Sequence, residues 1–112
     1  MTALARRGEA AQTQLQLADL QLDLLAREAR RGDTLLDLSN REFDLLAYLA
    51  SHQGQVVTRH MLLQNVWHYG LDTQTNVVDV HISRLRAKLD KGFSPPLLHT
   101  KRGQGFILQV EA

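Results

Sequence analysis

An amphipathic segment at residues 75–90, TNVVDVHISRLRAKLD, narrows the possible folds of this chain more than any other stretch. On a helical wheel at about 100° per residue, one narrow apolar stripe forms from Val78, Ile82, Leu85 and Leu89. That stripe can dock a helix on a core by one side only. Val77 and Val80 fall on the far side with Asn76, Ser83, Arg84, Ala87 and Lys88. We therefore expect the outer face to meet something other than water.

The composition of the chain predicts one small domain with a core of Leu, Val and Ala. The chain has 112 residues, 44% hydrophobic and only 5% aromatic, so Phe43, Trp67 and Phe106 are the expected large core residues. There is no Cys, which excludes disulfides, zinc fingers and thiol catalysis and suits a reducing compartment. No apolar run approaches the length of a membrane span. We expect a soluble, cytoplasmic protein with no membrane partner.

The first third of the chain predicts a linker followed by a small antiparallel sheet. Residues 1–14 lack a strand pattern and are interpreted as a linker or the remnant of a preceding segment, with one domain over residues 15–112. Leucines then alternate with polar residues in short pieces up to residue 38, which is the period of half-buried strands. Gly32-Asp33 predicts a hairpin turn between strands at Glu28–Arg31 and Thr34–Leu38.

Three helices and a hairpin are expected after the sheet. Ser39 and Glu42 form a capping-box pattern that begins the first helix, and Gly54 is a plausible left-handed stop. Thr58 is a suitable N-cap for the second helix. A loop at 67–74 precedes the third helix, which reaches about Asp90. Strands around Leu97–Thr100 and Phe106–Val110 flank the turn KRGQG. This order predicts an α+β fold, a winged helix-turn-helix.

The charge distribution favours an anionic partner at one face. Net charge is only +1, but residues 81–102 carry six Lys or Arg against Asp90 alone. The third helix fits a DNA major groove, where Arg84 and Lys88 could contact phosphates or bases. The basic hairpin tip could reach an adjacent minor groove. The alternative is an α+β domain whose basic helix and hairpin are merely solvated.

No motif for catalysis, a metal or a cofactor is found. The five histidines lack metal-ligand spacing, and the GQG at 103–105 precedes a strand, so no helix N-terminus faces a phosphate there. The serines have no nucleophile-elbow context. Asp79 is expected to pair with Arg86 or His81 in a structural role. We predict no enzyme activity and no cofactor.

The chain closely resembles the effector domain of OmpR/PhoB-family two-component response regulators. The resemblance rests on LSNREFDLLAYLASHQGQVVTRHMLLQNVW, TNVVDVHISRLRAKLD and LLHTKRGQGFIL, and it covers roughly residues 15–110. It implies a four-stranded sheet, three helices and a hairpin wing. Within the family, FSPPLLHT and SRLRAKLD are most similar to heavy-metal-responsive members, especially the copper/silver type.

The resemblance also implies roles for individual residues. The third helix becomes the recognition helix, with base-facing positions at Asn76, Val80, Ser83 and Arg84 and a neighbouring position at Val77. Phosphate-contacting positions fall on His81, Arg86, Lys88 and, at the start of the second helix, Thr58. The wing contributes Thr100, Lys101 and Arg102, with Arg102 in the minor groove. The loop that touches RNA polymerase corresponds to Tyr69, Gly70, Leu71 and Asp72.

Departures from the family pattern limit what can be carried over. Many members have Arg where this chain has Asn76 or Ser83, so base preference does not transfer, and Lys101 replaces a usual apolar residue. TALARRG resembles the end of a receiver domain's last helix. We therefore expect a C-terminal fragment whose full-length parent has a receiver domain and a sensor kinase partner. A rival interpretation is a winged-helix protein-interaction module without DNA binding, which would not need Lys101 and Arg102 beside Arg84 and Lys88.

Overall fold

The protein folds as two small antiparallel β-structures on either side of three helices. The structure is a computed structural model, and it describes residues 13–68 and 76–110. The first sheet contains β1 (Gln14–Leu17), β2 (Leu20–Asp23), β3 (Glu28–Arg31) and β4 (Thr34–Leu35). The described helices are α2 (Asn40–Ser51), α3 (Arg59–Asn65) and α4 (Asn76–Leu89), and the final hairpin pairs β5 (Leu98–Lys101) with β6 (Gly105–Leu108). The predicted α+β winged-helix class is confirmed.

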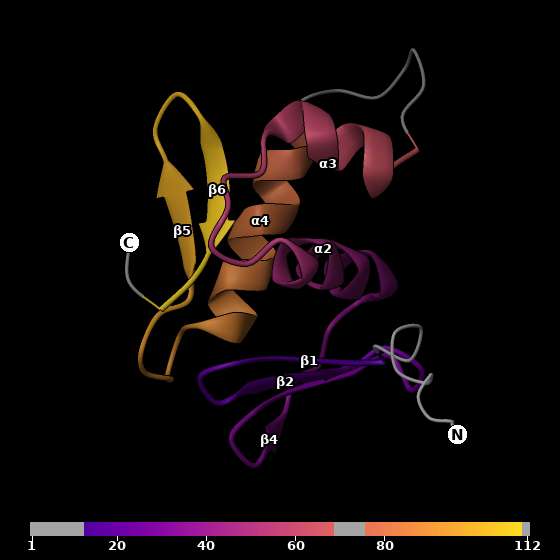
Figure 1. The fold of residues 1–112 in the computed structure, drawn as a ribbon, viewed down its shortest axis with the longest axis vertical. Coiled ribbons are helices and arrows are strands. Elements are labelled where there is room, and N and C mark those ends of the chain that lie inside the picture. Colours follow the sequence, from indigo (N-terminus) through magenta and orange to yellow (C-terminus); the bar gives the residue numbers. More distant parts are fainter. Residues whose placement is uncertain (1–12, 69–75, 111–112) are drawn as a thin grey trace, which may run out of the picture.

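The layers place the N-terminal sheet far from the hairpin tip. In Figure 1, the sheet lies at one end of the molecule, α2 crosses the middle, and the tip of the β5–β6 hairpin lies at the other end, beside the start of α4. The helices therefore lie between the sheet and the tip of the hairpin (Figure 1). None of the helices within residues 13–68 and 76–110 is long and apolar enough to cross a membrane.

The N-terminal sheet follows the alternation in the sequence. Its strand order is β1-β2-β3-β4, and its inward residues Leu20, Leu22 and Ala29 are buried. The predicted turn at Gly32 is confirmed, with φ +60. The predicted strand at Thr34–Leu38 is wrong in extent, because only Thr34 and Leu35 pair with β3. The Leu36 amide still donates to Ala29 O at 2.8 Å, and the chain then leaves the sheet for the start of α2.

Both predicted helix caps are confirmed. The Ser39 hydroxyl accepts from the Glu42 amide at 3.1 Å, and the Ser39 amide donates to Glu42 Oε1 at 2.9 Å. Thr58 Oγ1 accepts from the Met61 amide at 3.1 Å and begins α3. The prediction that Gly54 stops the first helix is wrong, although its φ of +82 is left-handed. The helix ends at Ser51, and the Gly54 amide instead donates to Leu108 O at 2.9 Å.

The core forms where α2, α4 and the two β-structures meet. The predicted stripe of α4 is confirmed, since Val78, Ile82, Leu85 and Leu89 are all buried. Phe43 and Phe106 are also buried, as expected from their size. Trp67 is only partly buried. The Arg41 guanidinium lies over its ring, 5.3 Å from the ring centre. The His81 ring meets it edge-on, with 5.2 Å between the ring centres.

The hairpin strands are fixed to the segment that connects α2 and α3. Val57 pairs with Phe106, and the two residues exchange amide–carbonyl bonds of 2.7 and 2.8 Å. Gly105, at φ +152, lies so close to this segment that a β-carbon there would be 2.2 Å from Val57 O. The predicted strands were nearly correct, but the second one begins at Gly105 and ends at Leu108.

A buried arginine joins the N-terminal sheet to the end of α4. Arg31 is 1% exposed, and its guanidinium donates to Asp19 Oδ1 at 2.8 Å, Leu89 O at 2.9 Å, Asp90 Oδ1 at 3.2 Å and Pro95 O at 2.9 Å. The Asp90 carboxylate also accepts from the amides of Leu97 and Leu98, at 2.9 and 3.0 Å. One buried cation thus organises the sheet, the C-terminus of α4 and the start of β5.

Candidate nucleic-acid interface

The outer face of α4 is exposed as the helical wheel predicted. Asn76, Ser83 and Arg84 are exposed, and Val80 keeps 42% of its surface. Arg84 forms no ion pair or hydrogen bond with any residue of the described ranges. Val77, which the wheel places on the same side, is expected to be partly covered near the helix start, and this is confirmed. Val77 is half-buried and packs against the core cluster.

Lys88 is held by an acidic side chain beneath it. Its Nζ lies 2.7 Å from Glu42 Oε1, and the Glu42 side chain is only 5% exposed while that of Lys88 is 39% exposed. Burial acts to raise the pKa of Glu42, but hydrogen bonds from Lys88 and from the Ser39 amide, with the charge of Lys88, leave that pKa below its ordinary value. The predicted phosphate ligand therefore also stabilises the start of α2.

Arg86 lies between α4 and the wing. Its Nε donates to Leu98 O at 3.2 Å and its Nη2 donates to Thr100 Oγ1 at 2.7 Å, both on β5. Arg86 is half-buried, whereas Arg84, two residues earlier on the helix, is exposed. The sequence predicted phosphate contacts for Arg86 and did not anticipate these bonds.

His81 is turned toward Trp67 and its own helix. Its Nδ1 lies 2.9 Å from Val77 O, so this nitrogen carries a proton when the bond forms. Its ring meets the edge of the Trp67 ring, and the residue is half-buried. The side chain is at the flank of α4, as predicted.

The predicted partners of Asp79 are wrong. Asp79 Oδ1 accepts from Arg59 Nε at 2.9 Å, rather than from Arg86 or His81. Arg59 is the first residue of α3, and its guanidinium also lies 4.9 Å from the centre of the Phe106 ring. The pairing of Arg59 was not predicted from the sequence. A cation in the first turn of a helix is disfavoured by the helix dipole, so its presence there indicates a partner elsewhere in the fold.

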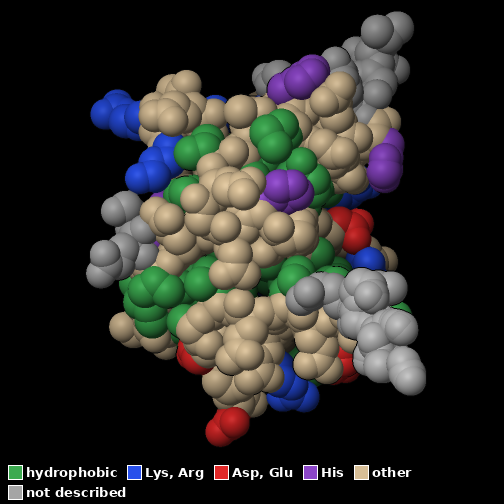
Figure 2. Space-filling model, viewed as in Figure 1, with side chains coloured by type: hydrophobic (Ala, Val, Ile, Leu, Met, Phe, Trp, Pro, Cys, Tyr) green, Lys and Arg blue, Asp and Glu red, His purple; other side chains and the backbone are tan. Residues whose placement is uncertain are grey.

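The wing presents its cations at the free end of the hairpin. Thr100 and Arg102 are exposed, Lys101 is half-exposed, and Lys101 pairs with Gly105 to close the turn. Figure 2 shows Lys and Arg side chains standing out from the hairpin side of the molecule. Thr58 lies beside this hairpin, since its Cα would be 2.9 Å from a β-carbon at Gly105. The wing and Thr58 therefore lie close together, and the bonds from Arg86 to β5 join the same hairpin to α4.

Four predicted residues lie outside the described residues. Tyr69, Gly70, Leu71 and Asp72 belong to the segment 69–75, so the structure does not place the predicted RNA polymerase loop. Described residues resume at Asn76, which is the first residue of α4.

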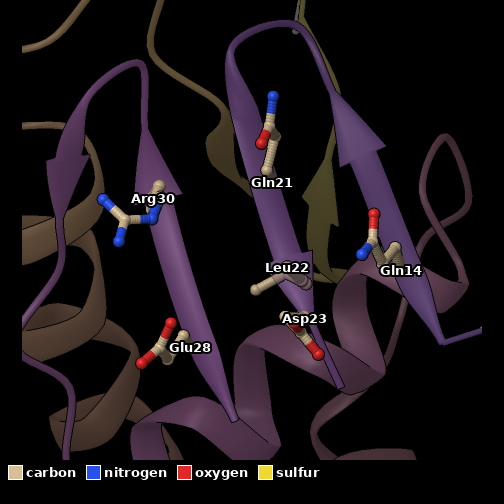
Figure 3. Close-up of a pocket in the computed structure, with 6 residues that line it drawn as sticks. All are labelled: Gln14, Gln21, Leu22, Asp23, Glu28 and Arg30. Atoms are coloured by element: carbon tan, nitrogen blue, oxygen red, sulfur yellow. The ribbon is translucent and has the colours of Figure 1, made fainter. Parts of the chain in front are cut away.

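A separate hollow of about 140 Å³ lies on the outer face of the N-terminal sheet. Figure 3 shows its lining, which consists of Gln14, Gln21, Leu22, Asp23, Glu28 and Arg30. Asp23 and Glu28 are directly opposite each other across β2 and β3. Two like charges in register oppose DNA binding here, and the sheet is remote from the hairpin tip (Figure 1). This hollow is not part of the candidate interface.

Lowering the pH is expected to weaken the fold through Glu42. Because its folded pKa is lowered, the contribution of this carboxylate is complete above the unfolded pKa and is lost as the pH falls through the folded pKa. Glu42→Gln keeps the capping box and removes the charge, so it should cost about 1 kcal/mol at neutral pH, discounted for the exposure of Lys88. Urea unfolding at a series of pH values measures both chains. A cost that stays the same at acid pH would contradict this role.

The comparisons with known proteins agree with this geometry. Residues 32–108 match the family described as "Transcriptional regulatory protein, C terminal". The transcriptional regulatory protein CusR of Escherichia coli K12 is 42% identical over 109 residues, which cover 96% of this chain and 48% of CusR. The chain thus spans about half the length of the curated relatives it matches.

Solved structures share the fold, and those of RstA and DrrB are two of them. The RstA DNA-binding domain of Klebsiella pneumoniae, solved in complex with the RstA box, superposes with a TM-score of 0.76 at 34% identity, covering 86% of this chain and 96% of that one. The response regulator DrrB of Thermotoga maritima, an OmpR/PhoB homologue, has a TM-score of 0.76 at 28% identity, covering 87% of this chain and 44% of DrrB. The family match and these similarities lead to one conclusion: this chain belongs to the OmpR/PhoB-type family of C-terminal domains of transcriptional regulatory proteins.

Proposed function

We propose that this chain binds double-stranded DNA in a sequence-specific manner, with α4 in the major groove and the wing in the adjacent minor groove. The observation that carries the proposal is the outer face of α4, where Val80 is exposed beside Arg84, which has no partner among the described residues. A solvent-facing valine next to an uncommitted arginine suits a base-pair edge, which offers a thymine methyl beside hydrogen-bond acceptors. The similarity to the RstA domain, solved with its DNA box, supports the same mode of binding.

The proposed contacts divide between bases and phosphates. Asn76, Val80, Ser83 and Arg84 face the bases, with Val77 at the rim, and His81 and Thr58 face phosphates. Arg102 and Lys101 reach the minor groove from the wing. Arg86 and Lys88 add positive charge at this surface, but their bonds to β5 and to Glu42 give them a structural role first.

Val80→Ala should weaken specific binding while leaving the fold nearly intact. A substitution at an exposed site should lower the free energy of unfolding by less than about 1 kcal/mol. The lost methyl groups reduce contact with a thymine methyl. Binding to a random duplex should change little, because phosphate contacts dominate there. Affinities come from titrations of the duplex that this chain selects from a random pool, alongside thermal melts.

Uracil substitution supplies the matched control for Val80. Replacing the contacted thymine by uracil removes only the methyl group, so it should reproduce most of the loss with the unchanged protein. If every uracil-substituted duplex binds as well as its thymine form, Val80 does not contact a thymine methyl. A large drop in melting temperature for Val80→Ala would instead mean that the valine supports the core.

Arg102→Ala should weaken DNA binding by about 1–3 kcal/mol and leave the melting temperature almost unchanged. The side chain is exposed on the turn between β5 and β6, so it contributes little to the fold. A cation in a narrow minor groove is strongly attracted to the negative potential there. A filter-binding titration at moderate salt measures the effect, and an unchanged affinity would exclude insertion of the wing.

The same family membership supports a regulatory setting for the chain. We propose that it is the effector domain of a cytoplasmic response regulator whose parent has a receiver domain and a sensor kinase partner, with residues 1–14 as the linker or tail of that receiver domain. The identity with CusR supports the heavy-metal-responsive subgroup. The domain would act as a monomer on each of two tandem half-sites, touch RNA polymerase through residues 69–72, and carry no enzyme activity. Retention on duplex DNA that weakens steeply with salt would separate it from a protein-interaction module.

A further inference from the structure

We infer that Arg86 is a positioning residue, which sets the wing against the recognition helix by holding Thr100, and that it acts on DNA through Arg102 rather than by touching DNA itself. The inference rests on the proposed function, since it concerns how α4 and the wing are kept in register for two neighbouring grooves. Neither Arg86 nor Thr100 then counts as a separate phosphate ligand.

The inference rests on two hydrogen bonds from the Arg86 side chain to strand β5. Arg86 Nη2 lies 2.7 Å from Thr100 Oγ1, and Arg86 Nε lies 3.2 Å from Leu98 O. Leu98 and Thr100 are alternate residues of β5, so the planar guanidinium fixes both the height and the tilt of the strand. A bond from a charged donor at this length is among the stronger kinds.

These two hydrogen bonds lie close to the charged residues of the wing, Lys101 and Arg102. Thr100 precedes Arg102 by two residues, and Lys101 between them pairs with Gly105 at the end of the hairpin. The opposite strand, β6, is fixed independently by the bridge between Phe106 and Val57. On the β5 side, the strand accepts hydrogen bonds from Arg86 of α4 at Leu98 and Thr100, and its Leu98 amide donates to the carboxylate of Asp90, the residue after α4. Arg86 is the one nearer the tip.

The contrast with Arg84 argues against a direct phosphate role for Arg86. Arg84 is exposed and bonded to nothing in the described ranges, so its guanidinium is free for DNA. Arg86 is half-buried, and its Nε and Nη2 already donate to β5, so a shift of its guanidinium toward a phosphate would disturb the bonds that hold the strand in place. A misplacement of about 1 Å between the two contact surfaces is enough to reduce binding through both, because their geometry must match simultaneously.

The test is a set of double-mutant cycles on the 112-residue chain, bound to the duplex it selects from a random pool. Arg102→Ala in the unchanged chain should weaken binding about tenfold. In Arg86→Met or Thr100→Val it should weaken binding less than about threefold, because a released wing no longer presents Arg102. Arg86→Met and Thr100→Val together should be no worse than either alone. Thr100→Ser keeps the hydroxyl and should bind like the unchanged chain.

Arg84→Met is the matched control, because it removes the same charge from the same helix without touching β5. It should lower the slope of log affinity against log salt by about one and leave the tenfold effect of Arg102→Ala in place. Thermal melts of Thr100→Val should show an intact fold, because Thr100 is exposed.

Two results would overturn the inference. One is a salt slope lowered by about one in Arg86→Met, together with a separate, additive loss for Thr100→Val, since both side chains would then contact DNA independently. The other is an effect of Arg102→Ala that is equally large in all backgrounds. If Arg102→Ala has no effect even in the unchanged chain, the wing contact of the proposed function fails, and the additivity of Arg86→Met with Thr100→Val still decides whether those residues act as a unit.

Discussion

Gly105→Ala is expected to lower the free energy of unfolding by about 2–5 kcal/mol, combining overpacking with backbone strain. A β-carbon at this position would lie 2.2 Å from Val57 O and 2.9 Å from the Thr58 Cα. Both neighbours are backbone atoms, so no rotamer change relieves the overlap. The φ of +152 adds strain for any residue with a side chain. Urea unfolding of the purified chain measures the loss.

Gly103→Ala provides the comparison for Gly105. It has a φ of +74 and also lies in the wing, but nothing would come within 4 Å of its added β-carbon. Its cost should stay near 1 kcal/mol, from strain alone. Equal costs at the two positions would mean that the close approach of β6 to Val57 does not constrain the fold.

Arg31→Met is expected to cost about 3–5 kcal/mol, because it removes the cation from a buried network and leaves the other members unsatisfied. The Asp90 carboxylate, whose side chain is 10% exposed, loses its counter-charge, and the carbonyls of Leu89 and Pro95 lose their donor. The change should lower the melting temperature. It should also speed hydrogen exchange at the amides of Leu97 and Leu98, which Asp90 holds.

Asp19→Asn separates the exposed part of that network from the buried part. The Asp19 side chain is 42% exposed and contributes one bond to Arg31. Its replacement should cost less than about 1 kcal/mol. A comparable loss for both variants would place the stabilising interaction at the sheet surface rather than at the end of α4.

The parts of the fold that depend on neighbouring residues were predictable from sequence. Ser39 and Glu42 are three residues apart, and the cap they form is set by local geometry alone. The four apolar residues of α4 and the outward position of Val80 follow from the helical period in the same way. The exact end of β4 did not follow, because it depends on where the chain turns away from β3 toward the N-cap of α2 at Ser39.

Interactions between distant segments were not predictable. Arg84, Arg86 and Lys88 look alike in a sequence, since each is a cation on one helix. Only the positions of β5 and of the first turn of α2 show that Arg86 meets Thr100 and that Lys88 meets Glu42, 46 residues away. The same limit explains the wrong partners for Asp79, which pairs across 20 residues with Arg59. The sequence shows that each of these side chains is charged, but only the folded structure shows which partner it binds.

The buried position of Arg31 has a consequence for how the chain folds as it is synthesised. Its carbonyl and carboxylate acceptors at Leu89, Asp90 and Pro95 are made 58, 59 and 64 residues later. Until then a nascent N-terminal sheet must keep this guanidinium in water, which holds β3 away from its final packing. We therefore expect the sheet, although it is translated first, to reach its final packing only when the end of α4 and the start of β5 are available. We also expect α4 and the wing to reach their final packing in the same late step as the sheet.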